Sequence, residues 1–116
     1  MRLIIWKMKM NKYTELSDFE INKKVAEYLK LNTIAYERTE IVLFDDMDAT
    51  PFDPCNNQSD AFPLIIDVKL SIHPDFYNDC ESWVVRTVHI PPVKDESLTR
   101  AICIAYLLMK DAENEG

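Results

Sequence analysis

The sequence predicts an α+β fold: one small domain in the order α-β-β-α-β-α, with helices packed on a short, mainly antiparallel sheet. Hydrophobic residues make up 47% of the 116 residues, which is enough to form one core. Apolar residues recur at helical spacing near both ends of the chain, and segments rich in β-branched and aromatic residues lie between them. We expect residues 10–116 to form the domain and residues 1–9 to be an extension outside the fold, because Met10 offers a later start codon.

The first predicted helix covers residues 17–31. Ser17 and Glu20 form a capping box, in which the serine hydroxyl accepts a hydrogen bond from the Glu20 amide. Apolar residues then recur along one helical face, and Asn32 is the expected end of the helix.

Two short strands are predicted within residues 33–44. This segment is rich in β-branched and aromatic residues and is interrupted by the polar residues 37–40, which indicates a hairpin. An acidic loop over residues 45–51 follows. Pro51 and Pro54 are expected to keep the chain extended up to Cys55.

Residues 59–70 fit two structures. From Leu64 onward, apolar residues alternate with other residues, which indicates a strand. A helix capped at Ser59 or Asp60 would instead place Pro63 in the first turn, where its missing N–H costs little. The residues alone leave both structures open and slightly favour the strand.

A strand over residues 82–90 and a helix over residues 96–112 are predicted in the last third of the chain. Pro91 and Pro92 end the strand. The helix is apolar on nearly every face, so we expect it to be buried in the core or covered by a partner. A homodimer through the 96–112 helix is therefore one expectation.

The charge of the chain is negative and uneven. The net charge is −7, and residues 31–116 carry six Lys or Arg and sixteen Asp or Glu, which gives 6 − 16 = −10 for that part. This balance disfavours direct binding of nucleic acid and suits a basic protein partner. No apolar run approaches the roughly 20 residues of a membrane helix, so we expect no membrane association.

Glycine occurs once, as Gly116. Phosphate-binding loops, dinucleotide-binding fingerprints and the nucleophile elbow of hydrolases all need glycine where the backbone approaches a ligand, so the sequence excludes them. Asn, Asp and Pro are expected to make the turns. The three cysteines have no export signal before them, so we expect reduced thiols in a cytosolic protein.

No catalytic, metal or cofactor site is predicted. The residues Cys55, His73, Cys80 and His89 lack the closely spaced pairs of a zinc site. Cys55 as a nucleophile would lack an oxyanion-binding motif. A calcium loop built on the nearby aspartates would lack both the turn glycine and the closing glutamate.

Two segments remain as candidate binding sites. The first is the loop containing Asp53, Cys55, Asn56, Asn57, Gln58 and Asp60, whose amides can face a partner. Its structural alternative is a turn that Asn56 and Asn57 make in left-handed backbone. The second is the acidic patch Asp45, Asp46 and Asp48, whose alternative is a solvated loop. Trp6, Tyr13, Phe76 and Tyr77 are expected to be exposed, and Trp83 to be buried.

Two stretches of the chain resemble a known family. They are Phe52-Asp53-Pro54-Cys55-Asn56-Asn57, followed by Asp60-Ala61-Phe62-Pro63-Leu64-Ile65-Ile66, and the opening Tyr13 to Lys23. Together with the order of the elements, over roughly residues 10–110, they resemble the NinX-like family of small phage and prophage proteins. Phe62 stands where tryptophan is expected in relatives. The resemblance implies a helix after the loop, so we predict a helix over residues 59–70.

The resemblance also implies a protein of a lambdoid phage or prophage of enteric bacteria, acting in the host cytoplasm, and it implies no known activity. We therefore expect a small acidic accessory protein that is not an enzyme and that binds a host or phage protein. One alternative is an acidic mimic of nucleic acid that inhibits a DNA-binding enzyme, since residues 37–60 hold seven acids and one base. Another alternative is a small enzyme or ligand-binding domain that uses the Cys-Asn-Asn loop.

Overall fold

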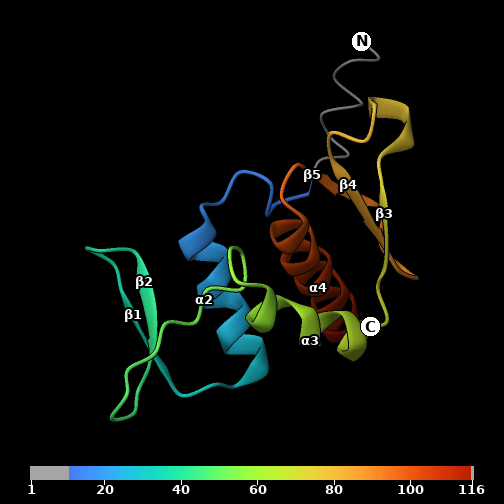
Figure 1. Ribbon diagram of the computed structural model, residues 1–116. Coiled ribbons are helices and arrows are strands. Elements are labelled where there is room, and N and C mark those ends of the chain that lie inside the picture. The colour runs from blue at the N-terminus through green and yellow to red at the C-terminus, as the bar shows by residue number, and fades with distance from the viewer. Residues whose placement is uncertain (1–10, 116) are drawn as a thin grey trace.

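The computed structural model describes residues 11–115, and within that range three α-helices, five strands and one short 3₁₀-helix surround one hydrophobic core (Figure 1). The α+β class is confirmed, but the order is α-β-β-α-β-β-β-α, and the strands form two separate antiparallel sheets. The predicted extension over residues 1–9 lies outside the described residues. The elements are α2 (Asp18–Leu29), β1 (Thr33–Tyr36), β2 (Ile41–Phe44), α3 (Gln58–Val68), β3 (Ser71–Pro74), η1 (Phe76–Asn78), β4 (Trp83–Arg86), β5 (Val93–Asp95) and α4 (Leu98–Glu115).

Helix α2 begins where the capping box predicts. Ser17 has extended backbone, and its hydroxyl accepts from the Glu20 amide at 3.2 Å. The helix ends earlier than expected, at Lys30 instead of Asn32. The Lys30 backbone is left-handed, with φ of 58°, and its amide donates to the carbonyls of Ala26 and Glu27.

The expectation that Asn, Asp and Pro make the turns is wrong for the left-handed positions. Asp79 is the one Asn or Asp residue among the described residues with positive φ; the others are Lys30, Glu40, Ala49, Lys69, Cys80 and His89. Lys30 and Lys69 are the C-caps of α2 and α3, and the amide of each donates to a carbonyl of its own helix. These local bonds offset a conformation that costs a residue with a Cβ about 1–2 kcal/mol relative to right-handed backbone.

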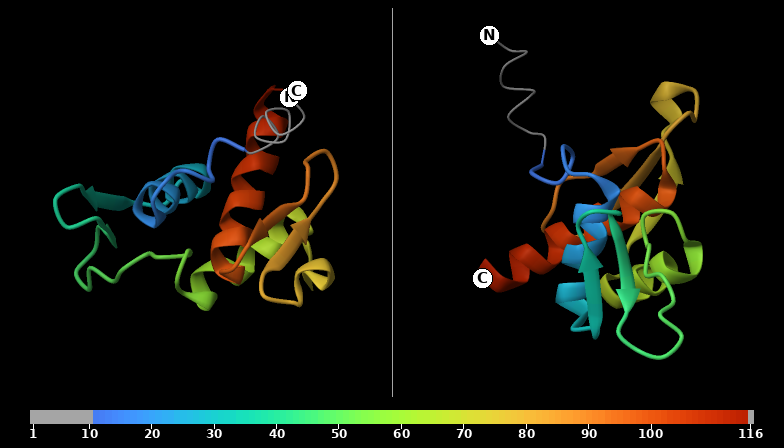
Figure 2. Two further views of the ribbon diagram at one scale, coloured as in Figure 1. Left: turned by 90° about the horizontal axis from the view of Figure 1, so that it is seen from above. Right: turned by 90° about the vertical axis from the view of Figure 1, so that its left-hand side faces the viewer.

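The β1–β2 hairpin has the predicted position and turn. Ile34 pairs with Leu43 and Tyr36 with Ile41, so these four side chains share one face of the two-stranded sheet. The other face, with Ala35, Val42 and Phe44, packs on the core. Figures 1 and 2 show the hairpin beside α2, on the side away from α4.

Helix α3 confirms the predicted helix, with a different start. Asn57 caps it, not Ser59 or Asp60, and Pro63 therefore lies in the second turn instead of the first. The strand pattern misleads because Leu64, buried here, and Val68 are four residues apart and share a face in either structure. Ile66 distinguishes the strand from the helix, because a strand would bury its side chain together with Leu64, whereas the helix leaves it 79% exposed.

The three-stranded sheet has the order β3-β4-β5 and is antiparallel throughout. The predicted strand over residues 82–90 is reduced to β4, because a turn around His89, with φ of 70°, reverses the chain. Pro91 and Pro92 then lead into β5, which the sequence did not indicate. Trp83, expected to be buried, is partly exposed.

Helix α4 forms the centre of the fold. Residues 101–107 are all buried, because α2, α3 and the three-stranded sheet pack around the helix (Figure 2). Its apolar circumference is thus covered within the chain, and a homodimer through the 96–112 helix stays a prediction. In the part of the chain that the structure describes, no helix has the length and hydropathy to cross a bilayer.

Candidate functional site

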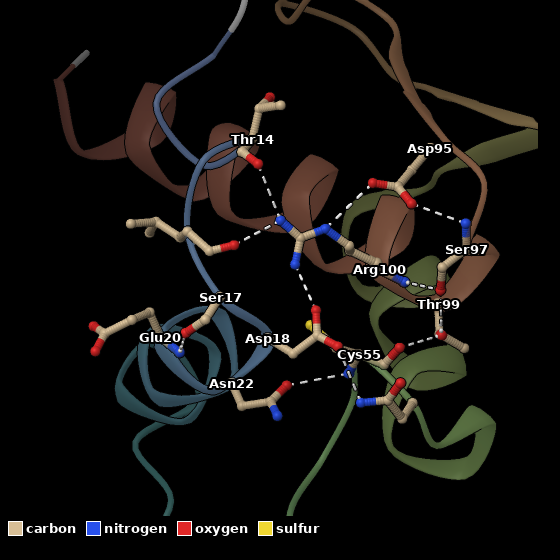
Figure 3. Close-up of polar contacts among 12 residues, drawn as sticks. Thr14, Ser17, Asp18, Glu20, Asn22, Cys55, Asp95, Ser97, Thr99 and Arg100 are labelled. Carbon is tan, nitrogen blue, oxygen red and sulfur yellow. Dashed lines mark hydrogen bonds and ion pairs between the residues drawn. The ribbon is translucent and has the colours of Figure 1, made fainter. Parts of the chain in front are cut away.

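The predicted binding loop lies where the first turns of α2 and α4 meet (Figure 3). After Pro51, which pairs with Leu43 across β2, the chain does not stay extended up to Cys55: it turns at Pro54, and the Asn57 amide donates to the Asp53 carbonyl at 2.8 Å. Pro54 and Cys55 are buried, whereas the side chains of residues 56–58 are exposed.

Asn22 holds this loop to α2. Its Nδ2 donates to Asp53 Oδ1 at 2.7 Å, and its Oδ1 accepts from the Cys55 amide at 3.1 Å. Asn22 is itself buried, and its bond to the Cys55 amide forms away from solvent, where an unpaired polar group is costly. One amide side chain of α2 therefore binds two groups of the loop.

The other candidate residues of the loop also make contacts within the chain. Asn56 Nδ2 lies 3.2 Å from Asp18 Oδ2 and 3.1 Å from Asp53 Oδ1. Asp60 Oδ2 accepts from the Asp53 amide at 3.0 Å. Gln58 is the first residue of α3 and is exposed.

Asn57 has a capping role, and neither asparagine has the left-handed backbone that we expected. Asn57 has φ of −121°, and its Oδ1 accepts from the Ser59 amide at 2.9 Å. Asn56 is not among the residues with positive φ. Asn56 lies in the turn and Asn57 caps α3, so that the Asn57 side chain satisfies the Ser59 amide at the N-terminus of the helix.

Arg100 joins the first turn of α4 to the region before α2 (Figure 3). Its Nη1 lies 2.5 Å from Asp18 Oδ1, and its Nε lies 3.3 Å from Asp95 Oδ2. Its Nη2 donates to the carbonyl oxygens of Thr14 and Leu16. A cation near a helix N-terminus is unfavourable by itself, and the two carboxylates offset this cost.

Cys55 is placed as a structural residue. Its side chain is 1% exposed, and its carbonyl accepts from Thr99 Oγ1 at 2.5 Å. Cys103 is its buried neighbour, and burial together with the contact to Cys55 raises the pKa of the Cys103 thiol well above its usual value. Neither thiol has the exposure that a reactive cysteine requires.

A pocket of about 280 Å³ lies beside the loop, between α2 and the end of the hairpin. Asp18, Glu40 and Asp53 contribute carboxylates to its lining, and Asn22 and Asn56 contribute amides. The carboxylates of Asp18 and Asp53 accept hydrogen bonds from these amides. Among the described residues, no group of three or more His, Cys, Asp or Glu side chains could hold a metal ion. The pocket is acidic, and two of the carboxylates in its lining are hydrogen-bonded to its amides.

The residues considered as zinc ligands lie in different environments. Cys55 is buried and Cys80 is exposed, and the His73 ring stacks on Phe76 with the ring centres 5.9 Å apart. Phe76 and Tyr77 are exposed, as predicted.

The acidic patch Asp45, Asp46 and Asp48 lies in the exposed loop after β2. Asp46 Oδ1 accepts from the amides of Asp48 and Ala49 at 3.1 and 2.8 Å, so it closes the loop. Asp45 and Asp48 leave their carboxylates toward solvent without an ion pair to any described residue.

An apolar surface that the sequence did not single out lies next to this acidic patch. We define the hairpin face as Ile34, Tyr36, Ile41 and Leu43. Ile34, Tyr36 and Ile41 are 41%, 45% and 42% exposed, and Ile41 also lines the acidic pocket. The two-residue side-chain period of a strand could have indicated this face, because the hairpin was predicted with its correct turn and the large apolar Ile34 and Tyr36 alternate with smaller residues.

A second polar cluster was also missed. The Tyr13 hydroxyl donates to Asp111 Oδ2 at 2.5 Å, the Tyr28 hydroxyl donates to Oδ1, and Lys12 Nζ lies 3.1 Å from Oδ2. Tyr13 is buried, so the expectation of an exposed ring is wrong. Burial and the bond to Asp111 raise the pKa of Tyr13. Burial by itself would raise the pKa of Asp111, but the bonds from Tyr13, Tyr28 and Lys12 lower it below its usual value.

The polar anchors Asn22 and Arg100 were missed for a physical reason. Asn22 binds residues 31 and 33 positions away, and Arg100 binds three residues 82 to 86 positions away, so no local spacing reveals these contacts. The available signal was a polar residue next to the apolar stripe of α2, where Asn22 follows the buried Ile21.

Comparison with known families gives one match. A family model described as "Bacteriophage P22, NinX" matches residues 12–110. Comparison with curated proteins and with solved structures finds no match.

Proposed function

This chain belongs to the bacteriophage P22 NinX family, and we propose that it is a small acidic accessory protein that acts by binding another protein of the phage or of its host. It works without catalysis, in the host cytoplasm. The observation that carries this proposal is the hairpin face, an apolar surface on two strands, the second of which leads directly into the exposed acidic patch.

The hairpin face is suited to an interface. Three of its side chains keep about two fifths of their surface in water, although they belong to strands whose opposite face packs on the core. Burial of apolar surface contributes about 25 cal/mol per Å², so a partner that covers these side chains gains affinity. Contiguous apolar surface with a polar rim is typical of protein-binding sites.

The Cys-Asn-Asn loop supports the same proposal by its structural role. Asn22, Thr99 and Asp18 take up hydrogen-bonding groups of the loop, and the thiol of Cys55 is buried. A catalytic loop would need to direct such groups at a substrate. The exposed side chains of residues 56–58 remain able to extend an interface.

An acidic mimic of nucleic acid is the second candidate. It is favoured by the exposure of Glu37, Glu40, Asp45, Asp46 and Asp48, five acids with Arg38 as the base between them. Such a protein would bind through its charges, so its affinity would fall steeply with salt. Binding through the hairpin face would depend on salt much less.

Affinity purification of the tagged full chain from infected host bacteria tests these alternatives, with mass spectrometry at about 50 mM and about 500 mM salt. One protein retained at both concentrations supports binding through the hairpin face. One protein retained at low salt and lost at high salt supports the acidic mimic. If no protein is enriched at either concentration over an untagged control, the binding proposal is contradicted.

A further inference from the structure

The two edges of the β1–β2 hairpin differ. The outer edge of β2 is occupied by residues 50–52: the Phe44 amide donates to the Thr50 carbonyl, and the Phe52 amide donates to the Val42 carbonyl, both at 2.9 Å. Among the described residues, no strand pairs with the outer edge of β1. The small sheet therefore has one closed edge and one open edge (Figure 1).

The alternation of hydrogen-bonded and non-hydrogen-bonded pairs between β1 and β2 shows which backbone groups of β1 face the open edge. Asp45 donates to the Asn32 carbonyl across the hairpin, so these residues form a hydrogen-bonded pair. Hydrogen-bonded pairs alternate in an antiparallel ladder, so Ile34 with Leu43 is the next such pair. The amide and carbonyl of Ala35, and those of Thr33, consequently point away from β2. No hydrogen bond to another described residue involves them.

We propose that this open edge of β1 receives an extended segment of the partner protein, which adds a third strand to the hairpin and carries basic side chains. The proposal rests on the proposed function and specifies its binding mode. Strand addition supplies main-chain hydrogen bonds at Thr33 and Ala35. Apolar side chains of the added strand extend the row formed by Ile34 and Tyr36 on the hairpin face.

Charge selects a basic partner over a second copy of the chain. Residues 33–50 carry five acids and one base, which are exposed around the turn and the following loop. Glu40, Asp45 and Asp48 have no ion pair with a described residue, so they remain available to lysine or arginine side chains. Two copies paired through β1 would bring two such surfaces together, and like charges there oppose association.

A defined peptide tests the proposal on the full chain. The probe is the blocked hexapeptide Lys-Val-Lys-Val-Lys-Val, and its controls are the glutamate counterpart and a form with an N-methyl group on every backbone amide, which cannot donate to β1 in either strand direction. Binding is followed by ¹⁵N NMR. We expect the lysine peptide to shift the amides of Thr33 and Ala35 and to slow their hydrogen exchange. We expect both controls to bind about tenfold more weakly or worse.

Ala35→Pro provides a matched variant. Proline is tolerated on edge strands, and here it removes one outward N–H and leaves the ladder to β2 intact. Ala35→Val keeps that N–H and is the control. The expected result is at least tenfold weaker peptide binding for Ala35→Pro and unchanged binding for Ala35→Val. The proposal is overturned if the N-methylated peptide binds as well as its parent, or if the lysine peptide leaves Thr33 and Ala35 unperturbed. These two readouts use the unaltered chain, so they decide the matter even if Ala35→Pro unfolds.

The same variant separates this inference from the proposed function. If the affinity purification recovers one partner equally with wild type and with folded Ala35→Pro, strand addition is wrong and protein binding stands. If the wild-type chain recovers no partner, the proposed function fails, and the peptide experiment alone decides whether the edge binds strands.

Discussion

The replacement Asn22→Ala removes the contact that fixes the predicted loop to the core. The change deletes the bond from Asn22 Nδ2 to Asp53 Oδ1 at 2.7 Å and leaves the buried amide of Cys55 without its acceptor. The affected residues are 31 and 33 positions away from Asn22, so the loss is one of tertiary structure, not of helix propensity.

The expected destabilisation is about 3 kcal/mol. A hydrogen bond to a charged group contributes about 1.5–3 kcal/mol, and an unsatisfied buried amide costs about 1–3 kcal/mol. The lower half of the first range applies, because Asp53 is only half-buried and keeps the bond from Asn56. A change of about 3 kcal/mol is a large part of the 5–15 kcal/mol typical of a small domain.

Urea unfolding of wild type, Asn22→Ala and Asn56→Ala measures this difference. Asn56 also binds Asp53, but its side chain is exposed, so its removal should cost no more than about 1 kcal/mol. The reasoning is refuted if Asn22→Ala and Asn56→Ala lower the free energy of unfolding by equal amounts.

Three further predictions concern caps, thiols and pH. Lys30→Gly should stabilise the protein by roughly 0.5–1 kcal/mol in urea unfolding, because it removes a Cβ from left-handed backbone. The control Glu27→Gly, within α2, should destabilise it by about 1 kcal/mol. A lower free energy of unfolding for both variants would contradict this account. A thiol reagent should modify one cysteine of the native protein rapidly, and Cys80→Ser should abolish that phase; rapid modification that persists in Cys80→Ser would show that a buried thiol is accessible. The lowered pKa of Asp111 makes its contribution to stability complete above the usual carboxyl pKa of about 4 and lost as the pH falls through the folded-state value. The difference in stability between wild type and Asp111→Asn should therefore shrink between pH 6 and pH 2.5, and a difference that grows toward low pH would show the opposite sign.

Local sequence signals predicted the elements whose determinants are close together in the chain. The capping box at Ser17, the hairpin around residues 37–40 and the apolar closing helix needed no knowledge of tertiary contacts. The same local reasoning made the strand that contains β4 too long and missed β3 and β5. The turn that ends the strand at His89 uses left-handed backbone, which no propensity of that residue indicates. The helix over 59–70 required the family resemblance, because the burial of Leu64 fits both a strand and a helix.

The residues of the candidate loop lie together in the structure, but their contacts could not be predicted from the sequence. Asp53, Asn56 and Asp60 were named as groups that could face a partner, but their bonds to one another and to α2 depend on distant residues. The hairpin face follows from strand register, which the two-residue period predicts, but its exposure depends on which side α2 covers. Tertiary packing, not motif chemistry, thus decides which surface remains free.

The most direct test of protein binding through the hairpin face is partner recovery with the double variant Tyr36→Thr and Ile41→Thr. Threonine keeps the β propensity of both positions and removes most of their exposed apolar surface. Wild type and variant would be used as bait in the same infected lysate at about 500 mM salt, after circular dichroism shows equal folding. We expect the partner protein recovered by wild type to fall at least tenfold with the variant. Equal recovery by the two proteins would contradict an interface on the hairpin face.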